Sequence, residues 1–188
     1  MGPTVVYRTA TSRVLGVSAL VLAVLAVGFF AVTGGLAEAL RSGPLVVFAA
    51  IAIWVTFALP HVTVSDGGVT VRNVLRTVHV PWPVFTGADS RWSLTVHTTQ
   101  GDVGSWAVPA PSGFAARASR DPAGQVERGV NAVTVAFAIG ERYRMLLEAG
   151  HLGRRTVQQV ELERRWNTGA AVALAAGAAL ALVGVLAG

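Results

Sequence analysis

The sequence predicts a membrane protein of mixed α and β structure: three transmembrane helices, an N-terminal hairpin and one C-terminal helix, with an antiparallel β domain and a further helix between them. Three observations carry this prediction. Hydrophobic residues make up 53% of the chain and charged residues 13%, and the mean hydropathy is +0.56, as in membrane proteins. Three runs carry no charge. The residues between the second and third runs alternate between apolar and polar types.

These patterns divide the chain into six segments. They are a cytoplasmic N-terminus (1–13), a transmembrane helical hairpin (14–59), a β domain (60–111), a linker (112–129), a helix with a juxtamembrane segment (130–166) and a C-terminal transmembrane helix (167–188).

The first apolar run, residues 14–36, contains 23 residues without a charge. As a helix it would measure roughly 34 Å, enough to cross a hydrocarbon core of about 30 Å. A cleaved signal peptide is the alternative, because Arg8 and Arg13 precede the run. The run is longer than the roughly 7 to 15 apolar residues of such a peptide, which favours a transmembrane helix.

The second run, residues 45–59, lies between Pro44 and Pro60 and has only fifteen residues. A spanning helix needs roughly 17 to 25, so this is the weakest of the three. Pro44 suits the first position of a helix, and Trp54 suits an anchor at the membrane interface. We expect the first two runs to form a hairpin with the short turn EALRSG, residues 38–43, between them.

The third run, residues 169–188, is uncharged and rich in small residues. Gly169, Ala173 and Gly177 recur every four positions, a spacing that lets helices pack closely in lipid, although alanine-rich filler would look the same. Before this run stand three residues that suit an interfacial anchor: Arg164, Arg165 and Trp166.

Arginines flank the apolar runs unevenly. Arg8 and Arg13 precede the first run, and four arginines in residues 154–165 precede the third, whereas the turn at 38–43 holds one Arg and one Glu. By the positive-inside rule, the N-terminus and the central region are cytoplasmic. The sequence therefore predicts a multi-pass protein of the cell membrane.

The first half of the central region has the pattern of β-structure. Alternation predicts strands over residues 61–64, 69–73, 78–82, 92–98 and 103–108. Asp66, Gly67 and Gly68 predict a hairpin turn that needs a positive φ, and Pro81 indicates a strand end or an edge. Short strands with turns at such intervals are typical of an antiparallel sheet or a partial barrel.

The second half of the central region is less regular. Residues 110–129 are rich in Pro, Gly, Ala and Arg, which indicates a linker or a loose loop. Residues 130–149 alternate like a strand, but their length, the pair Glu141 and Arg144, and Gly150 as a stop favour a helix, which we expect. Residues 156–166 fit either a strand or a helical lead into the third run.

A family resemblance rests on residues 68–111, GVTVRNVLRTVHVPWPVFTGADSRWSLTVHTTQGDVGSWAVPAP. Their order of motifs resembles the bacterial PH domain of small actinobacterial membrane proteins, the group that includes low molecular weight protein antigen 6. The motifs are Gly68-Val69-Thr70-Val71, Val80-Pro81-Trp82, Gly101 and Trp106-Ala107-Val108-Pro109. The resemblance implies a PH-like fold, a bent antiparallel sheet closed by a helix, and it implies no activity. It does not extend to residues 112–188.

Motifs for catalysis are absent from the sequence. There is no nucleotide-binding fingerprint, no zinc-protease motif and no nucleophile elbow, and a phosphate-binding loop with its lysine is excluded because all fifteen basic residues are arginine. With no cysteine, thiolate metal sites and disulfides are excluded as well. A metal site built from His61, His79, His97 and Asp66 is the remaining enzyme hypothesis, and we favour no cofactor and no enzyme activity.

A binding role has more support. Arg72, Arg76, His79 and Arg91 gather in sequence around Trp82 and Trp92, and basic residues near a membrane are attracted to anionic lipids. Alternatively, the tryptophans belong to the core and the arginines to a solvated strand face. We predict a non-enzymatic protein that contacts anionic lipid headgroups or a membrane protein partner. A scaffold without lipid specificity, partnered or homo-oligomeric, is the alternative, and nucleic acid is not expected because the basic excess is small.

Overall fold

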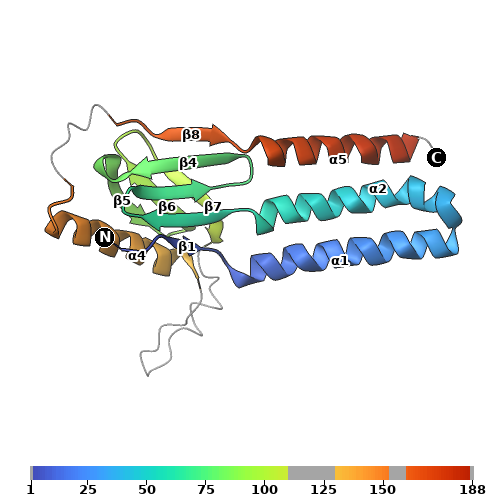
Figure 1. The fold of residues 1–188 in the computed structure, drawn as a ribbon, viewed down its shortest axis with the longest axis horizontal. Coiled ribbons are helices and arrows are strands. Elements are labelled where there is room, and N and C mark those ends of the chain that lie inside the picture. Colours follow the sequence, from blue (N-terminus) through green and yellow to red (C-terminus); the bar gives the residue numbers. More distant parts are fainter. Residues whose placement is uncertain (1, 110–129, 153–159, 187–188) are drawn as a thin grey trace, which may run out of the picture. The chain divides into compact units, whose positions relative to one another are not determined.

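The computed structural model describes residues 2–109, 130–152 and 160–186. The chain divides into two compact units, and Figure 1 shows the elements in chain order. One unit contains the strands and one helix (Met1–Thr9 and His61–Arg165), and the other contains the apolar helices (Ala10–Pro60 and Trp166–Gly188). The linker predicted for residues 112–129 lies outside the described residues.

The apolar unit consists of α1 (Ala10–Thr33), α2 (Gly35–Ile53), the π-helical turn η1 (Trp54–Ala58) and α5 (Thr168–Leu186). Within the described ranges, three helices are long and apolar enough to cross a membrane. They are α1, α2 together with η1, and α5, with 24, 24 and 19 residues. This finding is consistent with a membrane location and agrees with the three spans that the sequence predicts.

The predicted turn at residues 38–43 is wrong. These residues belong to α2, and the chain reverses at Gly34 and Gly35, where Gly35 has a φ of 72°. The charges at Glu38 and Arg41 had suggested a loop, but they are accommodated in the first turns of a helix, where the hydroxyl of Ser42 donates to Glu38 Oε1 over 2.6 Å. Pro44 is therefore inside α2 and does not begin it.

Small residues allow the apolar helices to pack. A Cβ on Gly16 of α1 would lie 2.8 Å from Cβ of Ala58, and one on Gly177 of α5 would lie 3.0 Å from the ring of Phe48 in α2. The predicted small-residue stripe on α5 is displaced, because Gly169 is exposed. The buried positions of α5 are Ala170, Gly177, Ala181 and Gly184.

The larger sheet of the other unit has the strand order β1-β2-β3-β4-β8. Its members are β1 (Val5–Tyr7), β2 (His61–Ser65), β3 (Gly68–Arg72), β4 (Arg76–Pro81) and β8 (Glu163–Trp166). The first four strands pair antiparallel, with Val62 opposite Val71 and Val69 opposite Val80. β1 is not expected from the sequence, and residues 163–166, for which both a strand and a helix were expected as alternatives, form a strand.

The smaller sheet has the order β5-β6-β7 and follows the short 3₁₀ helix η2 (Trp82–Val84). Its strands are β5 (Phe85–Asp89), which the sequence did not predict, β6 (Ser93–Thr98) and β7 (Val103–Pro109). The helix expected over residues 130–149 is confirmed as α4 (Ala132–Glu148). Its first turn is capped by the side chain of Asn131, which accepts from the backbone nitrogen of Thr134 over 2.9 Å.

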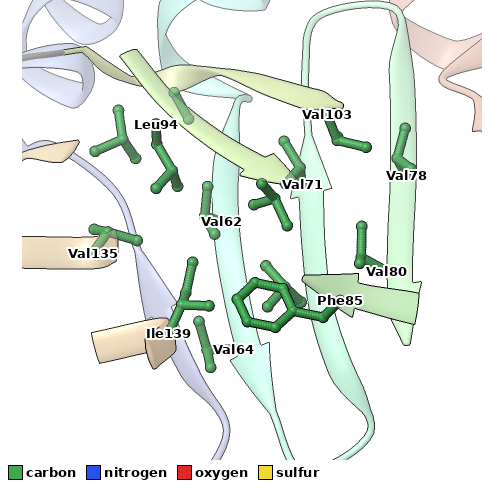
Figure 2. Close-up of a cluster of buried hydrophobic side chains, with 14 of the residues drawn as sticks. Val62, Val64, Val71, Val78, Val80, Phe85, Leu94, Val103, Val135 and Ile139 are labelled. Atoms are coloured by element: carbon green, nitrogen blue, oxygen red, sulfur yellow. The ribbon is translucent and has the colours of Figure 1, made fainter. Parts of the chain in front are cut away.

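One hydrophobic core joins both sheets to α4. Figure 2 shows valines of β2, β3 and β4 facing Leu94 of β6, together with Val135 and Ile139 of α4. Trp82 is 1% exposed, and its ring lies 5.5 Å from that of Phe85 and 5.8 Å from that of Tyr143. Trp82 is thus a core residue, whereas Trp92 is 83% exposed.

The predicted hairpin turn between β2 and β3 depends on Gly68. This residue has a φ of 147°, and a Cβ added there would lie 2.3 Å from the carbonyl oxygen of Val80 on the neighbouring strand. Glycine is required both by the backbone conformation and by the close approach of β4. The prediction of a positive φ in this turn is confirmed.

Candidate functional site

The larger sheet has one apolar face and one polar face. Val62, Val64, Val69 and Val71 point into the core, so the alternate residues of β2, β3 and β4 form the outer face. Arg72 and His79 lie on that face, where Nδ1 of His79 is 2.9 Å from the hydroxyl oxygen of Thr70 on the neighbouring strand.

Arg8, His61 and Arg72 gather at one end of this face, and we call them the basic cluster. Nη2 of Arg8 lies 3.0 Å from Nδ1 of His61, and His61 is opposite Arg72 in the pairing of β2 with β3. Because a guanidinium only donates, Nδ1 of His61 must accept, so in this arrangement the imidazole is neutral with its proton on Nε2. The positive charges of the cluster therefore belong to the two arginines.

Arg72 has an unmet hydrogen-bonding group. Its Nε is buried, and among the described residues it has no hydrogen-bond partner. A buried donor without an acceptor costs about 1–3 kcal/mol, more for a charged group. An anion with several oxygens that reached this side chain would supply the missing acceptor, since a guanidinium binds phosphate or carboxylate oxygens in pairs.

The predicted site residues are only partly brought together. Arg72 ends β3 and Arg76 begins β4, so both flank the same tight turn, in which the nitrogen of Asn73 donates to the carbonyl oxygen of Arg76 over 2.8 Å. His79 lies further along β4. Arg91 belongs to another turn, between β5 and β6, where its backbone nitrogen donates to Asp89 Oδ1 over 3.3 Å.

Sequence reasoning missed Arg8 and His61 as members of the cluster. Arg8 stands directly after β1, a strand that the sequence did not predict, and the pairing of β1 with β2 brings it beside His61. The signal that would have found it is the pair Val5-Val6 before Tyr7, a short β-branched run upstream of the first apolar helix.

The basic cluster adjoins the apolar helices along the chain. Two residues separate β1 from α1, two separate η1 from β2, and one separates β8 from α5. Since a residue spans at most about 3.6 Å of chain, the first residue of β2, His61, lies within roughly 11 Å of the end of η1. The proposed anchors differ in their surroundings: Trp54 packs near Gly16, whereas Trp166 is 61% exposed and follows Arg164 and Arg165 in β8.

Three of the histidines, His61, His79 and His97, each contact a different partner. Among the described residues, no group of three or more His, Asp or Glu side chains could hold a metal ion. His61 contacts Arg8, His79 contacts Thr70, and Asp66 forms an ion pair with Arg142, Oδ1 to Nε, at 3.4 Å. His61, His79, His97 and Asp66, the residues of the metal hypothesis, therefore contact separate partners and do not converge in the described part of the chain.

His97 bridges two carboxylates on the smaller sheet. Its Nδ1 lies 2.8 Å from Asp102 Oδ1 and its Nε2 lies 2.9 Å from Asp89 Oδ2, which requires both nitrogens to donate and the ring to be protonated. The hydrogen bonds to Asp102 and then Asp89 raise the pKa of His97, and the hydrogen bond from His97 lowers the pKa of Asp89. This bridge ties the ends of β5, β6 and β7 together.

A cavity of about 210 Å³ lies between β1, β2 and α4. Its lining is mostly apolar: Val5, Tyr7, Val64, Ala138, Glu141, Arg142 and Met145. Arg142 is already engaged by Asp66 and by the carbonyl oxygen of Pro3, to which its Nη2 donates over 2.6 Å. The two charged side chains that line the cavity, Arg142 and Glu141, thus already have partners on the protein.

Part of the sheet domain matches a known family model. Residues 59–120 match the family model described as bacterial PH domain, and this range includes β2 to β7. The match confirms the bacterial PH domain that the sequence predicted, whereas the narrower resemblance to actinobacterial membrane proteins stays a prediction. No curated protein and no solved structure matches the chain.

The class of protein follows from these findings. PH domains are generally non-catalytic modules that bind lipids or proteins. A bacterial PH domain in one chain with three helices apolar enough to cross a membrane is consistent with a membrane-associated PH protein.

Proposed function

We propose that this chain is a non-enzymatic integral membrane protein whose PH-like domain lies on the cytoplasmic side and contacts anionic lipid headgroups. The observation that carries the proposal is the basic cluster, in which the buried Nε of Arg72 lacks an acceptor among the described residues. The cluster stands at strand ends that adjoin apolar helices along the chain, so that its ligand would be found at a membrane surface.

Charge supports this proposal. No acidic residue occurs between Asp66 and Asp89, a stretch that contains Arg72 and Arg76. An arginine near an anionic leaflet contributes about 1 kcal/mol of binding free energy, which corresponds to roughly fivefold in affinity. The attraction acts within a Debye length of about 10 Å at 0.1 M salt, so it should weaken as salt is added.

Orientation rests on the positive-inside rule. Arg8 and Arg13 precede or begin α1, and Arg164 and Arg165 precede α5, whereas α1 and α2 are joined near one Glu and one Arg. This distribution supports a cytoplasmic sheet domain, in the cell membrane.

The test is lipid retention by the full-length chain. The protein would be solubilised mildly from membranes that contain phosphatidylglycerol and phosphatidylcholine, and its retained lipids counted by native mass spectrometry at low and high salt. Arg72→Gln and Arg76→Gln should each lower the affinity for phosphatidylglycerol roughly fivefold, so that less of this lipid is retained. The amount of retained phosphatidylcholine should not change.

Two further substitutions serve as a control and as a test of a second turn. Arg144→Gln is the matched control, because Arg144 is exposed on α4 and pairs with Glu141. Arg91→Gln tests whether the turn between β5 and β6 also contacts headgroups, as the sequence predicted. Equal retention by wild type, Arg72→Gln and Arg76→Gln would refute the lipid proposal and favour a scaffold that docks a membrane protein partner.

A further inference from the structure

Two large apolar side chains are exposed on segments that hydrogen bonds of Asn73 join together. Leu75, in the turn between β3 and β4, is 40% exposed, and Trp106, in β7, is 59% exposed. The side chain of Asn73 joins the two segments: its Nδ2 donates to the carbonyl oxygen of Gly104 over 2.8 Å, and its Oδ1 accepts from the nitrogen of Trp106 over 2.7 Å. We call residues 73–75 together with Trp106 the apolar tip.

Hydrogen bonds fix the backbone of the apolar tip. The hydrogen bond from the nitrogen of Asn73 to the carbonyl oxygen of Arg76 closes the turn, and the two bonds of the Asn73 amide fix that turn to β7. Little backbone entropy would therefore be lost when Leu75 and Trp106 are covered, which makes their burial more favourable than that of a flexible loop.

The surroundings of the apolar tip indicate what covers it. Arg72 and Arg76 flank the turn, and no acidic residue lies between Asp66 and Asp89. His61, opposite Arg72, begins a strand that two residues separate from the apolar turn η1. Apolar and aromatic side chains next to arginines fit the interface of a bilayer. There the apolar side chains enter the boundary of the acyl chains, and the arginines reach the headgroups.

We infer that Leu75 and Trp106 insert into the interfacial layer of an anionic bilayer and so dock the sheet domain on the membrane. This inference rests on the proposed function for the arginines that surround the apolar tip, and it adds a hydrophobic contact that headgroup binding alone does not require. The surface involved is the β3–β4 turn with β7, not the β2–β3 hairpin turn at the other end of β2.

The chain lacks cysteine, so a single introduced cysteine can be labelled without ambiguity. Leu75→Cys would carry an environment-sensitive fluorophore in the full-length chain, reconstituted into nanodiscs of phosphatidylglycerol and phosphatidylcholine, with and without lipids that bear a quenching nitroxide. We expect blue-shifted emission and quenching by the nitroxide lipids. Trp106→Cys, labelled in the same way, should give the same result and guards against a folding defect of one variant.

Gly67→Cys is the matched control. Gly67 is exposed in the hairpin turn at the far end of β2 and β3, its φ is not in the left-handed region, and the nearest atom to an added Cβ is 3.8 Å away. The label at 67 should remain unquenched. Absence of quenching at both 75 and 106, or equal quenching at 67, would overturn the inference.

Lipid charge separates this inference from the proposed function. If quenching at 75 persists in pure phosphatidylcholine while lipid retention shows no preference for phosphatidylglycerol, insertion stands and the anionic-headgroup proposal fails. If Arg72→Gln lowers phosphatidylglycerol retention while labels at 75 and 106 stay unquenched, the headgroup proposal stands and insertion fails.

Discussion

At the scale of single residues, His97 is the clearest titrating group of the sheet domain. It joins Asp89 of β5 and Asp102 of the β6–β7 turn, and all three side chains are at least one-third exposed. Sequence patterns did not predict this bridge, because the three residues become neighbours only through the pairing of β5 with β6 and the turn that follows. The pH dependence of the fold should reveal it.

His97→Gln should lower stability in acid more than in base. The pKa of His97 is raised above 6.5, so the protonated bridge stabilises the fold fully below that value and its contribution is lost as pH rises through the raised pKa. The pKa of Asp89 is lowered from 3.8, so its contribution is present above that value and is lost as pH falls through the lowered pKa. Thermal unfolding of the reconstituted chain at about pH 5.5 and about pH 9 measures the His97 contribution, because the Asp89 carboxylate stays ionised at both values.

The control for this prediction is His151→Gln. His151 is exposed after α4, and within the described ranges its ring forms no ion pair with a carboxylate. The melting temperature of wild type should exceed that of His97→Gln at the lower pH, and this difference should be smaller at the higher pH. The difference in melting temperature between wild type and His151→Gln should be the same at both pH values. A pH-independent effect of His97→Gln would contradict an ionic bridge.

At the scale of elements, the sequence predicted the strands whose valines alternate and missed two others. β2 and β6 alternate between buried and partly exposed residues along their whole length, and β3 and β4 do so except at their first residues, which is the pattern that a two-faced sheet imposes. β5, with the sequence FTGAD, contains Gly and Asp, which are depleted in strands, and forms because β6 pairs with it. β1 has only three residues, and its strand conformation comes from its pairing with β2.

Asp66→Asn should release β1 from the sheet. Asp66 Oδ2 accepts from the backbone nitrogen of Gly2 over 3.1 Å and its Oδ1 pairs with Arg142, which also donates to Pro3. Loss of a hydrogen bond to a charged group costs about 1.5–3 kcal/mol, so amide exchange in Val5–Tyr7 should accelerate by about tenfold or more. Hydrogen exchange by mass spectrometry on the reconstituted chain measures this.

Asp102→Asn provides the matched substitution at a distance from β1. It removes the same charge from the β6–β7 turn, and exchange in Val5–Tyr7 should stay at the wild-type rate. Unchanged exchange in Asp66→Asn would mean that backbone pairing with β2 holds β1 without the Asp66 and Arg142 contacts.

At the scale of the whole molecule, the burial of residues in α4 follows the periodicity of a helix, although its apolar residues alternate in sequence like those of a strand. Val133, Val135, Phe137 and Ile139 alternate in sequence as a strand would, yet Val135 and Ile139 are fully buried whereas Val133 and Phe137 are 52% and 66% exposed. Burial every third or fourth residue is that of a helix with one face on a core. The structure packs this helix in the same hydrophobic cluster as the strands.

Ile139→Ala should therefore destabilise the strands as well as the helix. Ile139 is 0% exposed within the shared core, and its truncation should cost about 2–4 kcal/mol, whereas Phe137→Ala on the exposed face should cost within about 0.5 kcal/mol. Hydrogen exchange in the reconstituted chain should accelerate together in α4, β2 and β6, since their buried side chains belong to one cluster. Acceleration confined to α4 would show that the helix unfolds independently, and the strands would then form a cooperative unit without it.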